Sequence, residues 1–475
     1  MKKGLFLLFF LAVWLIIYTY IRLHWEQNIQ DSITTIRNVT NLYSVIVDKV
    51  ISPINIIEIQ KEVKNYKWPI SIGWGRFSMW WQIATEWVLF VDMKKFNKII
   101  DFDLTWKTIT VQAGTSRYDI QKFINDYNLS VMIMQTYNNF TVWWSLSVNA
   151  HGRYVWLGPI INSVISMKII TASGDLLEAS PAINKDLFYS AIWWYGSLWI
   201  IAEVTLQLAD NTNIERSSEI IVINEYNNFF FNNVRYNSKA IFHNCDLYPP
   251  LYTKCRAITW TKTNKEASHK DVISRDNNYW KERIIMKIIA NRPWGKQLRK
   301  FIIDPLLFFS SPIHSRNYEA SYSVMELEPV SRKNSTYVLQ EYFVPERNLT
   351  WFVIGLQNIV KKHKPNIINI SIRHSIADKK SVLSRAKDNV FAFVIYYKQK
   401  TDQIDQEKVA VWTKELIDLS LLLSGSYYLP YQPHATKEQF KKAYPGYQDF
   451  LVIKHKYDPT NKFRNKLIDK YLLNK

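Results

Sequence analysis

The chain has 475 residues and a net charge of +19, from 60 Lys and Arg against 41 Asp and Glu. Hydrophobic residues make up 48% of it, which excludes wholesale disorder and permits large cores. The basic excess suits anionic lipid headgroups or solubility. Because the sequence shows no zinc knuckle, RNP-type aromatic motif or long Arg/Lys run, no nucleic-acid partner is expected. At roughly 150 residues per domain, the length favours two or three domains.

The N-terminus predicts a membrane anchor over residues 1–22. After Lys2 and Lys3, residues 4–21 carry no charge and read GLFLLFFLAVWLIIYTYI, near the lower length limit of a spanning helix. A cleaved signal peptide starts similarly but usually has a shorter apolar stretch and a small-residue cleavage site, which is missing here. The two lysines favour a cytoplasmic N-terminus and an exported, extracytoplasmic body, although Arg22 on the far side opposes this orientation.

From residue 54 the pattern predicts a first α+β region that ends near residue 210. Helical spacing is expected over 54–65 and 118–127. Strands are predicted over 70–72, 88–92, 108–112, 166–171, 176–178 and 200–208. The turn Ala172-Ser173-Gly174-Asp175 joins two of these strands as a hairpin.

The rest of the chain predicts a second α+β region. Residues 214–330 mix aromatic strands with a basic helical stretch, and their fold is hard to assign. Beyond them, strands are expected over 337–345, 366–373 and 390–397, and helices over 349–361 and 408–423. Cys245 and Cys255 form either one disulfide in an exported protein or two buried thiols. No His/Cys cluster indicates a metal.

Glycine and tryptophan occur in unusual proportions. The chain has 12 Gly and 19 Trp, whereas glycine alone is about 7% of average proteins. Several of the tryptophans fall in three stretches, SIGWGRFSMWWQ (71–82), TVWWSL (141–146) and AIWWYGSLWII (191–201). With glycine in place of tryptophan, these stretches read SIGGGRFSMGGQ, TVGGSL and AIGGYGSLGII.

Read in that form, the chain closely resembles the FAD-binding domain of the vanillyl-alcohol-oxidase (PCMH-type) flavoprotein family over about residues 50–210. Motif order, spacing and the intervening runs TITVQAG and ITASGDLLE all match. The likeness resumes at Tyr427–Gln432 and from Tyr444 to Pro459. Within the family, His151-Gly152-Arg153 and this C-terminus most resemble decaprenylphosphoryl-ribose 2-oxidases, with sugar-lactone and sugar-alcohol oxidases next.

The resemblance implies a two-subdomain FAD-binding domain over 23–212 and an α+β substrate (cap) domain over 213–424. It also implies a C-terminal segment, 425–475, that returns to the flavin. A histidine stands at the position of Arg76 in relatives that bind FAD covalently, so FAD is expected to be non-covalent. The expected cofactor contacts are Gly73, Trp74, Gly75, Arg76, Phe77, Ser78, Gln82, Thr136, Thr141, Val142, Trp143, Trp144, Ser145, Val148, Asn149, Ala150, His151, Ile201 and Tyr428.

The tryptophans conflict with this role. A pyrophosphate is held by backbone N–H groups at close approach, often at positive φ, which glycine permits and tryptophan does not. Independent mutation would hardly choose tryptophan at every doublet. We therefore hypothesise that a UGA codon, read as glycine in the source organism, stands here as tryptophan. Trp87, Trp106 and Trp156 join this set, whereas Trp412 looks genuine. The alternative is an aromatic-rich core that uses tryptophan.

Hydride abstraction from an alcohol carbon needs a base for the hydroxyl proton, while the flavin carries the redox chemistry. The resemblance places His151, Arg153 and Tyr428 near the reaction. Tyr431 stands where the ribose 2-oxidases carry a lysine, which speaks against decaprenylphosphoryl-ribose as the substrate. Further candidates for the substrate face are Gln340, Tyr342, Arg373 and His434.

The sequence therefore predicts a membrane-anchored FAD-dependent oxidoreductase, in contact with membrane lipid. It would oxidise a hydroxyl carbon of a sugar, polyol or lipid-linked sugar and pass electrons to a quinone or oxygen. One alternative is an aldonolactone or 2-hydroxy-acid oxidase on the same fold. Another is a non-catalytic membrane-bound descendant that no longer binds FAD.

Overall fold

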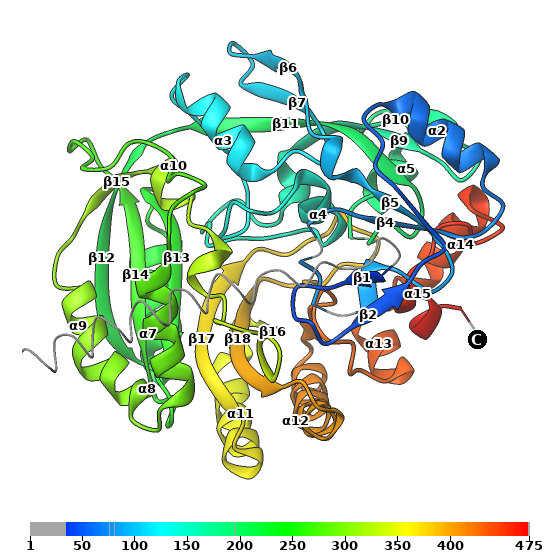
Figure 1. Cartoon of the computed structure of the whole chain (residues 1–475). Helices are drawn as coiled ribbons and strands as arrows, with labels where there is room; N and C mark the ends of the chain where they lie inside the picture. The colour runs from blue at the N-terminus through cyan, green and yellow to red at the C-terminus, as the bar shows by residue number, and fades with distance from the viewer. Residues whose placement is uncertain (1–34, 76, 80, 194, 474–475) are drawn as a thin grey trace, which may run out of the picture.

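The structure, a computed structural model, describes residues 35–75, 77–79, 81–193 and 195–473, with Trp81 described by its backbone only. The predicted anchor over 1–22 lies outside these residues. Within them, no helix combines the length and apolar character needed to cross a membrane. Helices and sheets are mixed, in agreement with the predicted α+β class (Figure 1).

A small parallel sheet forms the first part of the molecule. Its strands, in the order β3-β5-β4, are Lys49–Ile51, Leu89–Asp92 and Ile70–Gly73. All four residues of β5 are buried, as expected for a central parallel strand covered on both faces. Helix α2 (Ile56–Asn65) connects β3 to β4, and the Asn55 side chain caps it by accepting from Glu58 N at 2.9 Å. A two-stranded ribbon of β1 (Thr35–Arg37) and β2 (Ser44–Ile46) precedes this sheet.

A six-stranded antiparallel sheet follows. Strand β11 (Ile200–Asp210) is its centre and pairs with three other strands, β7, β8 and β9. The remaining strands and the helices between them are β6 (Ile99–Asp103), β7 (Thr108–Gln112), β8 (Leu129–Val131), β9 (Val164–Ile170), β10 (Leu176–Ala179), α3 (Arg117–Asn125), α4 (Val142–Ser147) and α5 (Lys185–Ser190). The predicted β9–β10 hairpin is present, and Gly174 in its turn has φ +82°.

The second half of the chain builds an eight-stranded sheet. The predicted boundary at residue 212 falls between β11 and β12. The strands, in spatial order, are β15 (Ile313–Ser315), β12 (Asn213–Val222), β14 (Lys254–Lys262), β13 (Ala240–Leu247), β17 (Asn366–Ser375), β18 (Val390–Lys400), β16 (Ser335–Pro345) and β19 (Ser426–Tyr427). Its helices are α6 (Tyr226–Phe229), α7 (Trp280–Asn291), α8 (Gly295–Leu298), α9 (Asp304–Leu307), α10 (Arg316–Glu319), α11 (Leu349–His363) and α12 (Gln403–Leu422). A disulfide joins Cys245 of β13 to Cys255 of β14, so these cysteines are not two buried thiols.

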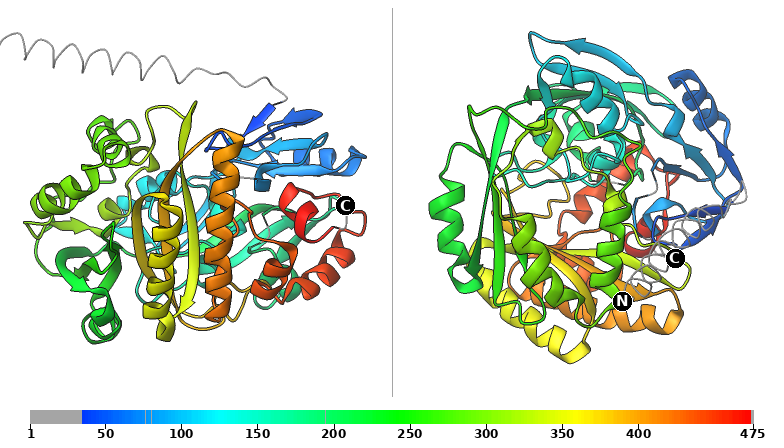
Figure 2. Two further views of the ribbon diagram at one scale, coloured as in Figure 1. Left: turned by 90° about the horizontal axis from the view of Figure 1, so that it is seen from below. Right: turned by 60° about the vertical axis from the view of Figure 1, so that its left-hand side comes forward.

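The two faces of β16 have different partners. Helices α11 and α12 lie side by side on one face (Figure 2), where Tyr342 Oη donates to Thr413 O at 3.4 Å. Because side chains alternate along a strand, the neighbouring residues Glu341 and Phe343 point to the opposite face. There, the Phe343 ring meets the His151 ring of the first domain at 5.6 Å. Strand β16 therefore brings the second domain against the predicted cofactor loops.

The C-terminal segment lies against the first domain. Its helices are α13 (Lys437–Ala443), α14 (Tyr447–Tyr457) and α15 (Lys466–Tyr471), drawn in orange to red beside the blue strands in Figure 1. Ile70 of β4 accepts from Arg464 N at 3.0 Å and donates to Lys462 O at 2.6 Å, so the segment adds to the edge of the parallel sheet.

Candidate functional site

Three loops of the first domain converge where the cofactor contacts were predicted. The first follows β4, the second contains α4, and the third, at 193–197, precedes β11. Trp143 N donates to Ala113 O at 2.8 Å, and Trp193 N donates to Leu146 O at 3.0 Å. The sequence stretches singled out above therefore form one region, although more than 100 residues separate their ends.

Indole rings fill the space between these loops. Trp74 and Trp143 stack with ring centroids 3.6 Å apart, and Trp193 stacks on Tyr428 at 5.1 Å. Trp74, Trp143 and Trp193 are all buried. The buried indole Nε1 atoms of Trp74, Trp143, Trp144 and Trp193 have no hydrogen-bond partner among the described residues. Each unpaired buried donor costs about 1–3 kcal/mol.

Several other polar atoms around the loops are also buried and unpaired within the described part of the chain. They are Gln82 Oε1, Gln135 Nε2, Thr136 Oγ1 and the three guanidinium nitrogens of Arg117. Burial lowers the pKa of Arg117 to about 10. Gln82 and Thr136 were predicted cofactor contacts, whereas Arg117 and Gln135 were not. An unpaired buried guanidinium is a signal that only the structure supplies.

The remaining predicted cofactor residues support the loops. Thr141 caps α4 by accepting from Trp144 N at 3.3 Å, and Ser145 Oγ donates to Gln135 Oε1 at 3.0 Å. Val148 O accepts from Tyr428 Oη at 2.9 Å. The others lie in the same loops or in β11: Gly73, Gly75, Phe77, Ser78, Val142, Asn149, Ala150 and Ile201. Arg76 lies outside the described residues.

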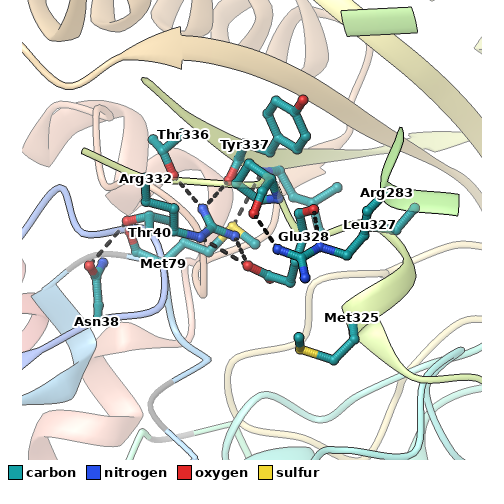
Figure 3. Close-up of polar contacts among 12 residues, drawn as sticks. Asn38, Thr40, Met79, Arg283, Met325, Leu327, Glu328, Arg332, Thr336 and Tyr337 are labelled. Carbon is teal, nitrogen blue, oxygen red and sulfur yellow. Dashed lines mark hydrogen bonds and ion pairs between the residues drawn. The ribbon is translucent and has the colours of Figure 1, made fainter. Parts of the chain in front are cut away.

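The second domain and the C-terminal segment hold the loop after Gly75 in place. Met79 N donates to Pro430 O at 2.9 Å, and Met79 Sδ accepts from Leu339 N of β16 at 3.2 Å. Thr40 Oγ1 donates to Met79 O at 3.2 Å. Figure 3 shows Thr40 and Met79 together with the ion pair of Arg332 and Glu328, 2.7 Å apart, which lies beside the start of β16.

A buried ion pair links the two domains at this site. His151 Nε2 lies 2.5 Å from Glu341 Oε1, and both side chains are almost inaccessible to solvent. Tyr431 Oη donates to the other carboxylate oxygen of Glu341 at 3.3 Å. His151 Nδ1 is buried and has no partner within the residues that the structure describes. Sequence reasoning missed Glu341, although an acidic residue inside a buried strand is itself an unusual feature.

Electrostatics fix the protonation state of this pair. Burial lowers the pKa of His151, and Glu341 only partly opposes it. Burial raises the pKa of Glu341, but His151, Arg373 and Arg385 outweigh it and hold that pKa below its usual value. At neutral pH the carboxylate is therefore ionised and the imidazole neutral. The Nε2 proton points to Glu341, and the Nδ1 lone pair is free to accept a proton.

Two arginines surround the pair. Arg373, a predicted substrate residue, lies on β17 and is in register with Ala392, which pairs with Phe343, so it occupies the Glu341 face. Arg385 donates through Nη1 to Asn149 O, and its charge lies 5.4 Å from the Trp193 ring centroid. Its Nε and Nη2 atoms are buried without a partner in the described chain. The site is thus cationic around one carboxylate.

Other predicted residues take different positions. Arg153 pairs with Glu319 at 3.0 Å, and its guanidinium lies over the Phe242 ring. Gln340 and Tyr342 lie on the face of β16 that is turned toward α12. His434 accepts from or donates to Thr413 Oγ1 at 2.6 Å on the same side. The structure therefore brings His151, Tyr428, Tyr431 and Arg373 together, but not these four.

A cavity of about 640 Å³ lies elsewhere, between the ends of α11, β18 and α12. Lys398, Lys400, Lys408 and Trp412 line it, and none of the predicted site residues does.

The residues as printed do not fit FAD. The unpaired atoms of Gln82, Gln135, Thr136 and Arg117 suit a polar ligand. However, the stacked indoles of Trp74 and Trp143 occupy the space between the loops that would approach a pyrophosphate. The Trp143 ring also lies directly against Gly196, where an added Cβ would be only 2.6 Å from it.

Comparisons with known proteins identify the domain. Residues 47–180 match the FAD binding domain family. L-gulonolactone oxidase of Mus musculus is 21% identical over 390 residues, covering 80% of this chain and 84% of the mouse protein. D-arabinono-1,4-lactone oxidase of Candida glabrata is 23% identical over 54% of this chain and 46% of its own length. The mitochondrial L-galactono-1,4-lactone dehydrogenase 2 of Oryza sativa is 32% identical over 27% of this chain and 23% of its own. The chain therefore carries an FAD-binding domain and is similar over most of its length to an enzyme that acts on a sugar lactone.

Proposed function

We propose that this protein oxidises a CH–OH carbon of a sugar-derived small molecule and that His151, oriented by Glu341, takes the hydroxyl proton. The observation that carries the proposal is the buried 2.5 Å pair, with an unpaired Nδ1 on the same imidazole. A neutral histidine fixed by a carboxylate is the usual arrangement of a general base.

The charges support this direction of proton transfer. When Nδ1 accepts a proton, the imidazole becomes cationic beside a carboxylate that is already ionised, so the pair gains attraction as the proton arrives. Burial raises the pKa of Tyr428 and Tyr431, so both phenols stay protonated and act as hydrogen-bond donors. FAD, when bound, would supply the hydride acceptor. Arg76 in place of a histidine supports a non-covalent cofactor.

Two substitutions test the base on enzyme that carries flavin. His151→Gln should lower kcat/KM by about 10²–10⁴-fold, the usual share of general acid–base catalysis. Glu341→Gln should also lower it and should move the acid limb of the pH–rate profile to lower pH, because the anion that raises the His151 pKa is lost.

A matched control exists on β17, which β18 separates from β16. His374 Nε2 lies 2.6 Å from Glu346 Oε1 in a similar buried-histidine pair outside the site. Glu346→Gln should therefore leave kcat and the pH profile unchanged. If it lowers kcat as strongly as Glu341→Gln does, the loss is structural and the assignment of the base is wrong.

The substrate is proposed to be an aldonolactone. The support comes from the relatives, which are named lactone oxidases or dehydrogenases, and from Tyr431, which replaces the lysine expected in ribose 2-oxidases. Anaerobic reduction of the bound flavin by a panel of aldonolactones, free sugars, polyols and lactate would test this. Reduction by polyols or free sugars alone would instead favour a sugar-alcohol oxidase.

Attachment to a membrane, and electron transfer to a quinone or oxygen, are also proposed. The apolar N-terminal stretch supports the anchor, and the Cys245–Cys255 disulfide is consistent with an oxidising compartment. The anchor would suit a lipid-linked substrate or a membrane quinone. Reoxidation of reduced enzyme by a soluble quinone analogue, compared with air, would separate the two acceptors.

The indole-filled site favours one rival, a non-catalytic protein that does not bind FAD. It predicts that protein purified from its native source lacks the yellow flavin absorption bands. Stoichiometric flavin in that preparation would exclude it.

A further inference from the structure

We infer that the native protein carries glycine at positions 74, 87, 143 and 193, and at the adjoining doublet positions 80, 81, 144 and 194. The glycines at the three loops would form the cradle that admits FAD. The cradle rests on the proposed function, whereas the backbone evidence below does not depend on it.

Backbone conformation is the first line of evidence. Trp87 has φ +56° and Trp193 has φ +87°. Side chains with a Cβ pay about 1–2 kcal/mol in the left-handed region, and only glycine enters it freely. Trp87 gains no burial in return, because 68% of its surface is exposed. The chain therefore adopts at both positions the conformation that glycine prefers.

Unpaired indole N–H groups are the second line. A buried tryptophan usually finds a hydrogen-bond partner for its N–H. The indoles at 74, 143, 144 and 193 all lack one within the described residues. Four buried indole N–H groups without a partner in one region indicate that the surrounding residues do not accommodate tryptophan there.

Tryptophans elsewhere behave differently. Trp412, on α12, lies edge-to-face on Tyr397 at 4.9 Å, and Trp260, in β14, packs against His314 at 4.9 Å. Both are buried at negative φ, and neither has a buried N–H without a partner in the described chain. The anomaly is therefore local to the cofactor loops and the Trp87 turn, and does not extend to every tryptophan.

Glycine at 74, 143 and 193 would remove the rings that fill the space between the three loops. Gln82, which has an unpaired Oε1, lies in the stretch after β4, and Gln135, which has an unpaired Nε2, accepts from Ser145 of α4. With the indoles absent, those polar atoms can face a ligand instead of aromatic carbon.

Peptide mass spectrometry of the protein from its native source tests the assignment directly. Tryptic cleavage isolates 68–76, 77–94 and 123–153, which together contain positions 74, 80, 81, 87, 143 and 144. Each position should be lighter by the difference between tryptophan and glycine. Peptide 409–414, which contains Trp412, is the internal control and should keep its tryptophan mass. Tryptophan at 74 and 143 would overturn the inference.

A second experiment separates this inference from the proposed function. The full chain is expressed as printed and with glycine at 74, 80, 81, 143, 144, 193 and 194, and flavin is measured after purification. The glycine chain should carry stoichiometric FAD and the printed chain none. Equal flavin in both would overturn the cradle. Glycine in the native peptides with no flavin in the glycine chain would leave the assignment standing and refute the flavoenzyme proposal.

The matched control replaces the same kind of residue away from the loops. Trp260→Gly together with Trp412→Gly should yield a destabilised chain that gains no flavin. Flavin uptake by this control would mean that loosening any part of the fold suffices, and would contradict a role specific to the three loops.

Discussion

Tryptophan is buried in two regions of this protein with opposite consequences. On α12, Trp412 occupies one of the i, i+3, i+4 positions that face the sheet, together with Val409, Leu416 and Ile417. Between the cofactor loops, Trp74 and Trp143 are buried against each other and Trp193 is buried against Tyr428. Burial alone does not distinguish the two regions.

The two regions differ in whether backbone conformation, sequence spacing and side-chain contacts favour the same residue. At Trp412, helix conformation, apolar spacing and ring geometry all favour the same residue. At Trp193, burial favours a large side chain, whereas backbone conformation and the unpaired N–H oppose it. Such local conflicts mark functional sites or errors in the sequence. The same kind of substitution, made in each region, therefore tests whether the two regions differ in this way.

The largest effect on stability is expected at α12. Trp412→Gly should lower the free energy of unfolding by about 3–5 kcal/mol for the lost side chain, and by about 1 kcal/mol more for glycine inside a helix. Urea denaturation would measure it. The control is Trp351→Gly on α11, which is 63% exposed and should cost only the helix contribution. Equal losses in both would show that Trp412 packs no better than a surface residue.

A substitution in the buried ion pair of Lys454 and Asp458, called the clamp below because it bonds to Ser197, should lower stability by nearly as much. Lys454 Nζ lies 2.9 Å from Asp458 Oδ2 and donates to Ser197 O at 2.7 Å, with both side chains buried. Lys454→Met leaves Asp458 uncompensated and should cost about 3–5 kcal/mol. Lys456→Met breaks the exposed pair with Asp186, which solvent screens, and should leave the melting temperature almost unchanged. Similar thermal shifts for both variants would refute the clamp.

Acid should destabilise the protein through two buried neutral histidines, one in β13 and one in the C-terminal segment. Burial lowers the pKa of His243 and of His434 to about 3, against 6.5 in the unfolded chain. Their contribution is complete above pH 6.5 and is lost progressively as pH falls toward 3, because only the unfolded chain takes up the protons. By pH 5 the loss should be roughly 2 kcal/mol per histidine. His434→Gln should flatten this slope, whereas His455→Gln, at an exposed position, should not.

The smallest effect has the opposite sign. Trp87→Gly should raise the free energy of unfolding by about 1 kcal/mol, because it relieves a positive φ without removing buried surface. A small increase in melting temperature would show it. A loss of stability would mean that Trp87 makes contacts worth more than its backbone strain.

Much of the fold could be predicted from local sequence. The β9–β10 hairpin, β7, α11 and β18 all carry clear periodicity or turn signals within a few residues. Strands β12, β13 and β14 could not be resolved in the same way, because their pairing joins residues up to about 50 positions apart. Local spacing does not contain that information.

The site was predicted unevenly for a related reason. The order of the motifs located the loops and His151, because short stretches of sequence are enough to identify them. Glu341 was missed, and its neighbours Gln340 and Tyr342 were chosen instead. Successive side chains of a strand point to opposite faces of the sheet, so an error of one residue selects the wrong face. Only the register with β18 determines which residue meets His151.

The C-terminal return determines when the first domain can be completed. Ser71 Oγ donates to Arg464 O at 2.6 Å across 393 residues of sequence, and Lys454 reaches Ser197 across 257. During synthesis, strand β4 therefore waits with an unpaired edge until nearly the whole chain has been made, and such edges favour aggregation. The domain that is translated first must finish folding last. A fragment ending at residue 212 would thus keep its sequence motifs but lack the residues that close them.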